Sequence, residues 1–125
     1  MRKLVLALIF TTLLTTLGCK HPGSQKLEGH WKGMKAEGVD GPTAMQATAF
    51  ATGTEIIAQG DQIAIQTPAG RNPAAKYFVD KEDATTLVIH SDRDGSAETF
   101  TFNEKADQMV WKIVAQRSIT FRKVQ

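Results

Sequence analysis

The stretch Glu98-Thr99-Phe100-Thr101-Phe102 places phenylalanines two residues apart, with a threonine between them. Because successive side chains of a strand point to opposite faces, this alternation predicts a β-strand with one apolar face. Four more runs alternate in the same way: residues 62–66, 86–90, 108–113 and 118–122. No window from Leu27 onward shows a helical stripe, so the chain is expected to be all-β.

Turn residues separate these runs at steps of about 7 to 12 residues, which is typical of successive hairpins. Connections this short join antiparallel strands, because parallel strands need longer crossovers. The expected strands are residues 28–36, 44–51, 54–59, 62–67, 75–80, 85–91, 96–102, 108–114 and 117–123. Such a series forms an up-and-down meander, which loses its exposed edges by closing into a barrel. The predicted fold is therefore a small antiparallel up-and-down β-barrel of about eight strands.

The size of the body limits what such a barrel can enclose. An eight-stranded barrel has a lumen just wide enough for packed side chains or one small ligand. Transmembrane barrels need strands of about 9 to 11 residues with apolar side chains facing outward. Here the alternate positions carry Thr, Lys, Gln and His, which excludes a membrane-spanning barrel.

The charge of the chain is concentrated in its first residues. The sequence has 15 Lys and Arg against 13 Asp and Glu, a formal net charge of +2. Arg2 and Lys3 account for the whole excess, so the remaining body is neutral overall. A neutral body lacks the basic surface that binds phosphates, so no nucleic-acid partner is expected.

Residues 1–18 are typical of a secretory signal peptide, with a basic start followed by an apolar stretch. That stretch, residues 4–17, contains four threonines and is shorter than the roughly 20 apolar residues of a transmembrane helix. Thr16-Leu17-Gly18-Cys19 resembles a bacterial lipobox, in which the cysteine is lipid-modified and becomes the mature N-terminus. Gly18 and Cys19 match the pattern, whereas Thr16 and Leu17 depart from it. The resemblance implies cleavage before Cys19 and a membrane anchor on Cys19.

The location follows from this anchor. The alternative is an ordinary secreted protein with a free thiol, but an unpaired cysteine is a liability in an oxidising compartment, and Cys19 is the only cysteine. Lys20 follows it, where an Asp would signal retention in the inner membrane of a Gram-negative host. We therefore expect a protein anchored in the bacterial cell envelope, at the outer membrane. Residues 19–26 are polar and are expected to form a tether, and residues 27–125 form the barrel domain.

Gly29, Trp31 and Arg122 form a pattern that resembles the lipocalin superfamily. There, a Gly-x-Trp on the first strand closes one end of the barrel, and an Arg from the last strand packs across the indole. A cation on an indole face contributes about 0.5 to 2 kcal/mol. The resemblance covers roughly residues 27–124 and implies a lipocalin-like barrel that binds a small apolar ligand. The chain is shorter than a true lipocalin and lacks the later motifs, which weakens the expectation of a transport cavity.

The large apolar residues support two interpretations of the barrel interior. In the first they line a ligand pocket, whose candidate residues are Trp31, Phe50, Phe100, Phe102, Met109, Trp111 and Phe121. In the second they form an ordinary core, because a body this small needs nearly all its large apolar side chains for its own stability.

The sequence shows no constellation typical of an active site or a metal site. His30 and His90 lie far apart, and no second cysteine or clustered carboxylate completes a ligand set. In residues 92–96, Gly95 lies at the fourth position of the run, whereas a calcium loop needs glycine at the sixth. No serine lies in a nucleophile elbow, and no pair of carboxylates is marked out. We expect no enzymatic activity, no cofactor and no metal.

Two functions of different classes remain. In the first, the anchored barrel binds a small apolar or amphipathic molecule. In the second, it is a non-enzymatic interaction module of the envelope, such as an assembly cofactor, a pilot protein or an inhibitor of an envelope hydrolase. A hollow interior favours the first function, and an interior filled with side chains favours the second.

Overall fold

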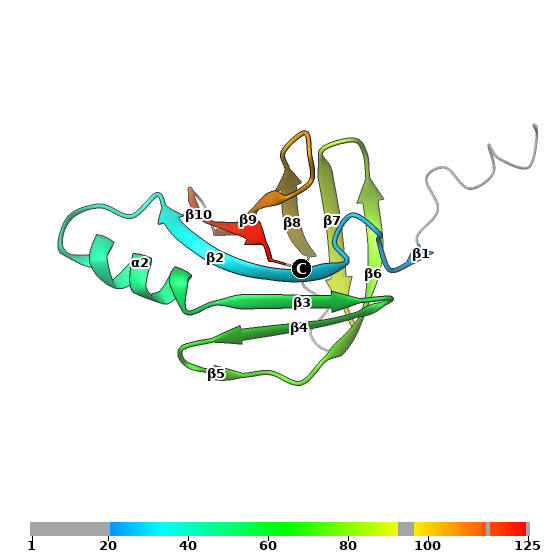
Figure 1. Ribbon diagram of the computed structural model, residues 1–125, viewed down its shortest axis with the longest axis horizontal. Coiled ribbons are helices and arrows are strands. Elements are labelled where there is room, and N and C mark those ends of the chain that lie inside the picture. Colours follow the sequence, from blue (N-terminus) through cyan, green and yellow to red (C-terminus); the bar gives the residue numbers. More distant parts are fainter. Residues whose placement is uncertain (1–20, 93–96, 115, 125) are drawn as a thin grey trace, which may run out of the picture.

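The computed structural model describes residues 21–92, 97–114 and 116–124, which form a closed antiparallel β-barrel (Figure 1). The expected signal peptide and the lipidation site Cys19 lie outside the described residues. The barrel strands are β2 (Gly29–Glu37), β3 (Glu55–Gln59), β4 (Gln62–Thr67), β6 (Ala75–Glu82), β7 (Thr86–Ser91), β8 (Ala97–Phe102), β9 (Gln108–Val114) and β10 (Arg117–Lys123). Each pairs with the next along the chain, and β10 pairs with β2. The predicted up-and-down barrel of eight strands is confirmed.

The barrel closes at a narrow seam between β4 and β6. Only two residue pairs join these strands, Gln62 with Lys76 and Ile63 with Ala75. Two short strands continue the hydrogen bonding beyond the pairs: β5 (Gly70–Arg71) pairs with the end of β4, and β1 (His21–Pro22) pairs with β6. Both short strands cover strand edges that the seam leaves open.

The strand predicted over residues 44–51 is wrong, because this stretch is a helix. The 3-10 turn η1 (Gly41–Thr43) leads into α2 (Ala44–Thr52), which connects β2 to β3. Four alanines give α2 a high helix propensity, and Pro42 lies at the start of η1, where its missing N–H costs nothing.

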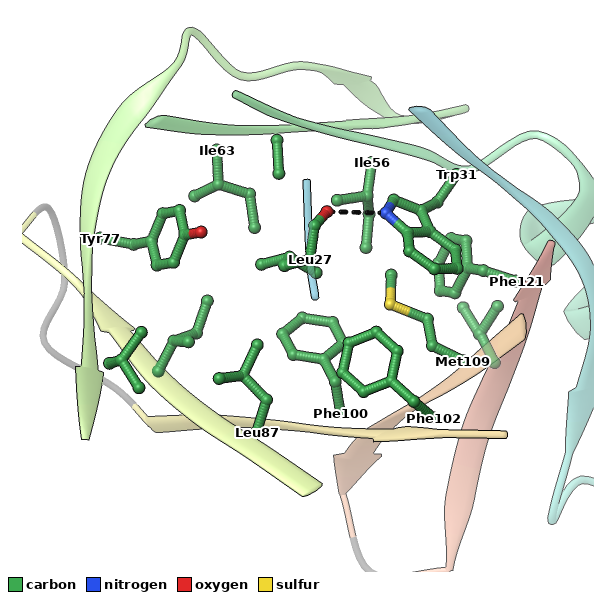
Figure 2. Packing of buried hydrophobic residues seen from close by; sticks show 14 of the residues in the cluster. Leu27, Trp31, Ile56, Ile63, Tyr77, Leu87, Phe100, Phe102, Met109 and Phe121 are labelled. Atoms are coloured by element: carbon green, nitrogen blue, oxygen red, sulfur yellow. Dashed lines mark hydrogen bonds between the residues drawn. The ribbon is translucent and has the colours of Figure 1, made fainter. Parts of the chain in front are cut away.

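The core follows the predicted alternation. Phe100 and Phe102 are buried, whereas Thr101 between them is exposed. Side chains from facing strands meet in the interior, as Figure 2 shows for Trp31 and Phe102. The buried apolar cluster consists of Leu27, Trp31, Ala51, Ile56, Ala58, Ile63, Tyr77, Val79, Leu87, Ile89, Phe100, Phe102, Met109, Ile119 and Phe121. Each large member contributes about 1.5 to 3 kcal/mol by leaving water, so this cluster is the main source of stability.

The two ends of the barrel differ. At the α2 end, the helix joins β2 to β3, and β10 begins (Figure 1). At the opposite end lie the tight turns β3–β4 and β6–β7, and residues 21–28 contact both turns. We call residues 21–28 the N-terminal segment and the end it contacts the closed end.

Candidate functional site

Helix α2 presents its small residues to the barrel and its large ones to solvent. Ala51 is fully buried, and Ala44 and Ala47 on the same side are half-buried. Met45 is 83% exposed, and Phe50 is 39% exposed. This is the reverse of an ordinary surface helix, which buries its large apolar side chains against the core.

The alanine side allows α2 to approach β2 very closely at Gly33. A Cβ atom on Gly33 would lie 1.8 Å from the carbonyl oxygen of Ala51, so only glycine fits there. The Gly33 N–H donates to the Thr54 carbonyl oxygen at 2.9 Å, and the Thr54 hydroxyl donates to the Phe50 carbonyl oxygen at 2.7 Å. These bonds fix the last turn of α2 against the barrel, which holds Met45 and Phe50 in an outward position.

The helix lies within a long uncharged stretch. No Asp, Glu, Lys or Arg occurs between Asp40 and Glu55, although charged residues make up 22% of the chain. Most residues of this stretch are exposed. The α2 end therefore offers solvent an uncharged surface that carries a large methionine and a phenylalanine.

A half-buried polar pair lies on the inner face of the barrel. The Trp111 indole N–H donates to the Glu98 carboxylate at 2.8 Å. Trp111 packs against the core, whereas Ile113, two residues further toward the α2 end, is 40% exposed. Solvent therefore reaches the inner wall of the barrel at this end.

The candidate pocket residues of the sequence analysis contact one another. Trp31 and Phe102 pack edge to face, with ring centroids 5.8 Å apart. Trp111 lies 6.2 Å from both Phe100 and Phe121, again between ring centroids. These spacings are those of packed aromatic pairs. The rings and the buried Met109 belong to the packed interior, whereas Phe50 lies outside it on α2.

The fold motif at the closed end uses a different cation from the one expected. The Trp31 indole N–H donates to the Leu27 carbonyl oxygen at 2.8 Å, and Lys123 Nζ lies 5.6 Å from the centroid of the Trp31 ring. Arg122, which was predicted to pack across the indole, is exposed on the other face of β10. The prediction of Arg122 is wrong, because Phe121 and Lys123 share the inner face and Arg122 lies between them.

The N-terminal segment is bound to the barrel, although its residues 21–26 were assigned to the tether. The Ser24 N–H donates to the Tyr77 hydroxyl oxygen at 2.8 Å, and the Tyr77 O–H donates to the Gly60 carbonyl oxygen at 3.3 Å. The Ser24 hydroxyl donates to the Glu82 carboxylate at 2.8 Å. Burial raises the pKa of Tyr77 above its ordinary value, and nearby carboxylates act in the same direction.

The histidines on the outer face are held by single carboxylates. His30 contacts Glu55, and His90 Nδ1 lies 2.8 Å from an oxygen of Asp80. The His90 ring also stacks on Phe78, with centroids 5.3 Å apart. Among residues 21–92, 97–114 and 116–124, no three His, Cys, Asp or Glu side chains gather to hold a metal ion.

The described part of the chain contains no helix with the length and apolar character needed to cross a bilayer. No protein-family model, curated protein or solved structure matches this sequence. The barrel and its surface are therefore the basis on which a function is inferred.

Proposed function

We propose that this chain is a lipid-anchored, non-enzymatic interaction module of the bacterial cell envelope, and that it binds a protein partner through the outward face of α2. One observation carries the proposal: Met45 is 83% exposed and Phe50 is 39% exposed on an uncharged helix whose one buried residue is Ala51. Apolar surface left exposed on a small protein marks interaction sites.

The packing of the core aromatic rings favours a partner over a deeply enclosed ligand. Trp31, Phe100 and Phe121 are fully buried and lie among the other core side chains (Figure 2). A lipocalin-like carrier would need these rings to stand apart around a cavity. The core interpretation of the candidate pocket residues therefore fits their packing better.

The lipobox-like Cys19 and the lipocalin-like Gly29 and Trp31 support the rest of the proposal. A cysteine at the mature N-terminus that carries acyl chains on its thiol and its amine anchors a small barrel firmly without any help from the fold. We place the barrel at the outer membrane, because Lys20 follows the cysteine.

The chemistry of α2 indicates the kind of partner. Because α2 has no charged residue, charge attraction cannot guide a partner to it. The partner is therefore a protein that offers an apolar groove to Met45 and Phe50. Binding would bury both side chains, and their burial would supply most of the affinity.

Photo-crosslinking in intact cells tests this proposal. A photoreactive amino acid at Met45 or Phe50 is expected to capture one discrete protein, while the same residue at Glu104, in the β8–β9 turn at the closed end, captures none. Phe50→Lys is expected to abolish the adduct formed from position 45. If no protein is captured from either helix position, or if Glu104 captures the same one, the proposal is wrong.

A second candidate, the binding of a small amphipathic molecule, is favoured by the Trp111–Glu98 pair. A carboxylate beside a half-buried indole and the exposed Ile113 could accept an amine group with an apolar tail. Native mass spectrometry of the unlipidated chain from Lys20 onward tests it. A discrete added mass that disappears on denaturation, and that Glu98→Gln weakens, would support this candidate, whereas a bare protein mass would oppose it.

A further inference from the structure

The N-terminal segment shortens the link between the anchor and the barrel. If residues 19–26 were free, the chain from Cys19 to Leu27 could extend over about 27 Å. His21, however, already pairs with Val79 of β6, and Pro22 pairs with Phe78. Only two peptide steps, about 7 Å, separate His21 from Cys19.

Contacts along the whole N-terminal segment hold it in place. Gly23 lies against the β3–β4 turn, since a Cβ atom there would be 2.7 Å from the Gly60 carbonyl oxygen. Lys26 Nζ donates to the carbonyl oxygens of Asp83 and Ala84 in the β6–β7 turn, at 3.3 and 2.9 Å. Leu27 is fully buried in the core. The segment therefore contacts the β3–β4 turn, the β6–β7 turn and strand β6, and its Leu27 is buried in the core. It is not a free tether.

β1, which begins two residues after the proposed anchor residue Cys19, and α2 lie at opposite sides of the barrel (Figure 1). Strand β2 runs from Gly29 at the closed end to Glu37 at the α2 end. Its length corresponds to about 20 Å along the barrel axis, allowing for the tilt of barrel strands.

From this arrangement we infer that the N-terminal segment holds the closed end of the barrel against the membrane surface and turns α2 away from it. The partner of the closed end is the lipid surface itself, reached through a link of about 7 Å. The inference rests on the proposed anchor at Cys19. It deepens the proposed function, because a fixed orientation presents Met45 and Phe50 to proteins of the aqueous compartment.

Energy transfer to labelled lipid measures this orientation. The chain has one cysteine, whose sulfur the anchor occupies, so a second cysteine can be labelled alone. The full lipidated protein, with Ala84→Cys at the closed end or Met45→Cys on α2, is reconstituted into vesicles of phosphatidylethanolamine and phosphatidylglycerol that contain an acceptor lipid. Transfer is expected to be about twofold or more higher from position 84, because the two sites differ by about 20 Å in height.

A longer link provides the decisive variant. A Gly-Ser-Gly-Ser insertion between Lys20 and His21 leaves the folded body intact and is expected to abolish the difference between the two labels. The same insertion between Asn72 and Pro73, in the loop from β5 to β6, is the matched control and should preserve it. Equal transfer from both labels in the unmodified protein, or a difference that survives the first insertion, would overturn the inference.

Failure of the anchor gives a different result from failure of the orientation. If the protein does not float with the vesicles, the anchor at Cys19 is wrong, and the inference falls with it. If the protein floats but both labels transfer equally, only the orientation is wrong. Absence of a protein adduct at α2 would refute the partner and leave the orientation intact.

Discussion

Lys123 lies over the indole of Trp31, with its Nζ 5.6 Å from the ring centroid. The two residues are direct partners in the register between β10 and β2, so this contact joins the last strand to the first. The indole also donates to Leu27, and its ring packs edge to face on Phe102. Trp31 therefore links the N-terminal segment, the core and the final strand at the closed end.

Trp31→Ala is expected to destabilise the fold by about 3 to 5 kcal/mol, because it removes a fully buried ring and leaves a cavity. Urea unfolding followed by circular dichroism measures the loss. A change below about 1 kcal/mol would be that of a surface position and would contradict this role.

The variants Lys123→Ala and Arg122→Ala show which of the two adjacent cations stabilises the fold. Removing Lys123 is expected to cost about 0.5 to 1 kcal/mol, since its ammonium and stem cover a buried indole. Removing the exposed Arg122 is expected to change stability by less than about 0.5 kcal/mol. The same urea measurement compares them, and a larger loss for Arg122 would restore the originally predicted role.

Most of the strands could be predicted from the sequence, because one face of each is apolar and the other polar. The same alternation could have assigned the cation correctly: Ile119, Phe121 and Lys123 share one face, and Arg122 lies on the other. The prediction gave more weight to the type of residue than to the face it lies on.

The helix and the N-terminal segment were harder to predict for physical reasons. In α2, the buried side consists of alanines, so no strong apolar period marks the helix, and its close contact with Gly33 arises only in the folded barrel. The absence of charge over residues 41–54 was visible and could have marked the surface. In the N-terminal segment, Ser24 bonds to Tyr77 and Glu82, which are more than 50 residues away, and no local pattern indicates this.

Gly33→Ala is expected to displace α2. The added Cβ would lie 1.8 Å from the Ala51 carbonyl oxygen, which belongs to the backbone and cannot rotate away. Such overpacking costs about 1 to 3 kcal/mol. Gly70→Ala is the control, because nothing lies within 4 Å of its added Cβ. Thermal unfolding compares the two variants. Equal melting temperatures would show that α2 can move away from the added Cβ without any loss of stability, which would contradict the prediction.

Cys19→Ser is expected to release the protein from membranes. The anchor is proposed to consist of acyl chains on this one cysteine, and the variant cannot receive them. Fractionation with a high-salt wash measures the outcome, with the amount of protein in the soluble fraction as the readout. Retention of the variant in washed membranes would refute the anchor.

Tyr77→Phe tests the N-terminal segment through the pH dependence of stability. Tyr77 is the only tyrosine, and burial raises its pKa in the folded protein above the ordinary value of 10.0. The unfolded chain therefore loses the phenolic proton first, so the stability contributed by the neutral hydroxyl is complete below pH 10 and is lost as the pH rises through the folded pKa.

Two measurements test the direction of this pKa shift. Tyrosinate absorbance should titrate at a higher pH in the folded protein than in urea. The loss of stability above pH 10 should be smaller in Tyr77→Phe than in the unmodified chain. At neutral pH the variant should lose about 1 to 3 kcal/mol, because the buried Ser24 N–H is left without its acceptor. A hydroxyl that titrates at its ordinary pH in the folded protein would show that Tyr77 is not buried beneath the N-terminal segment.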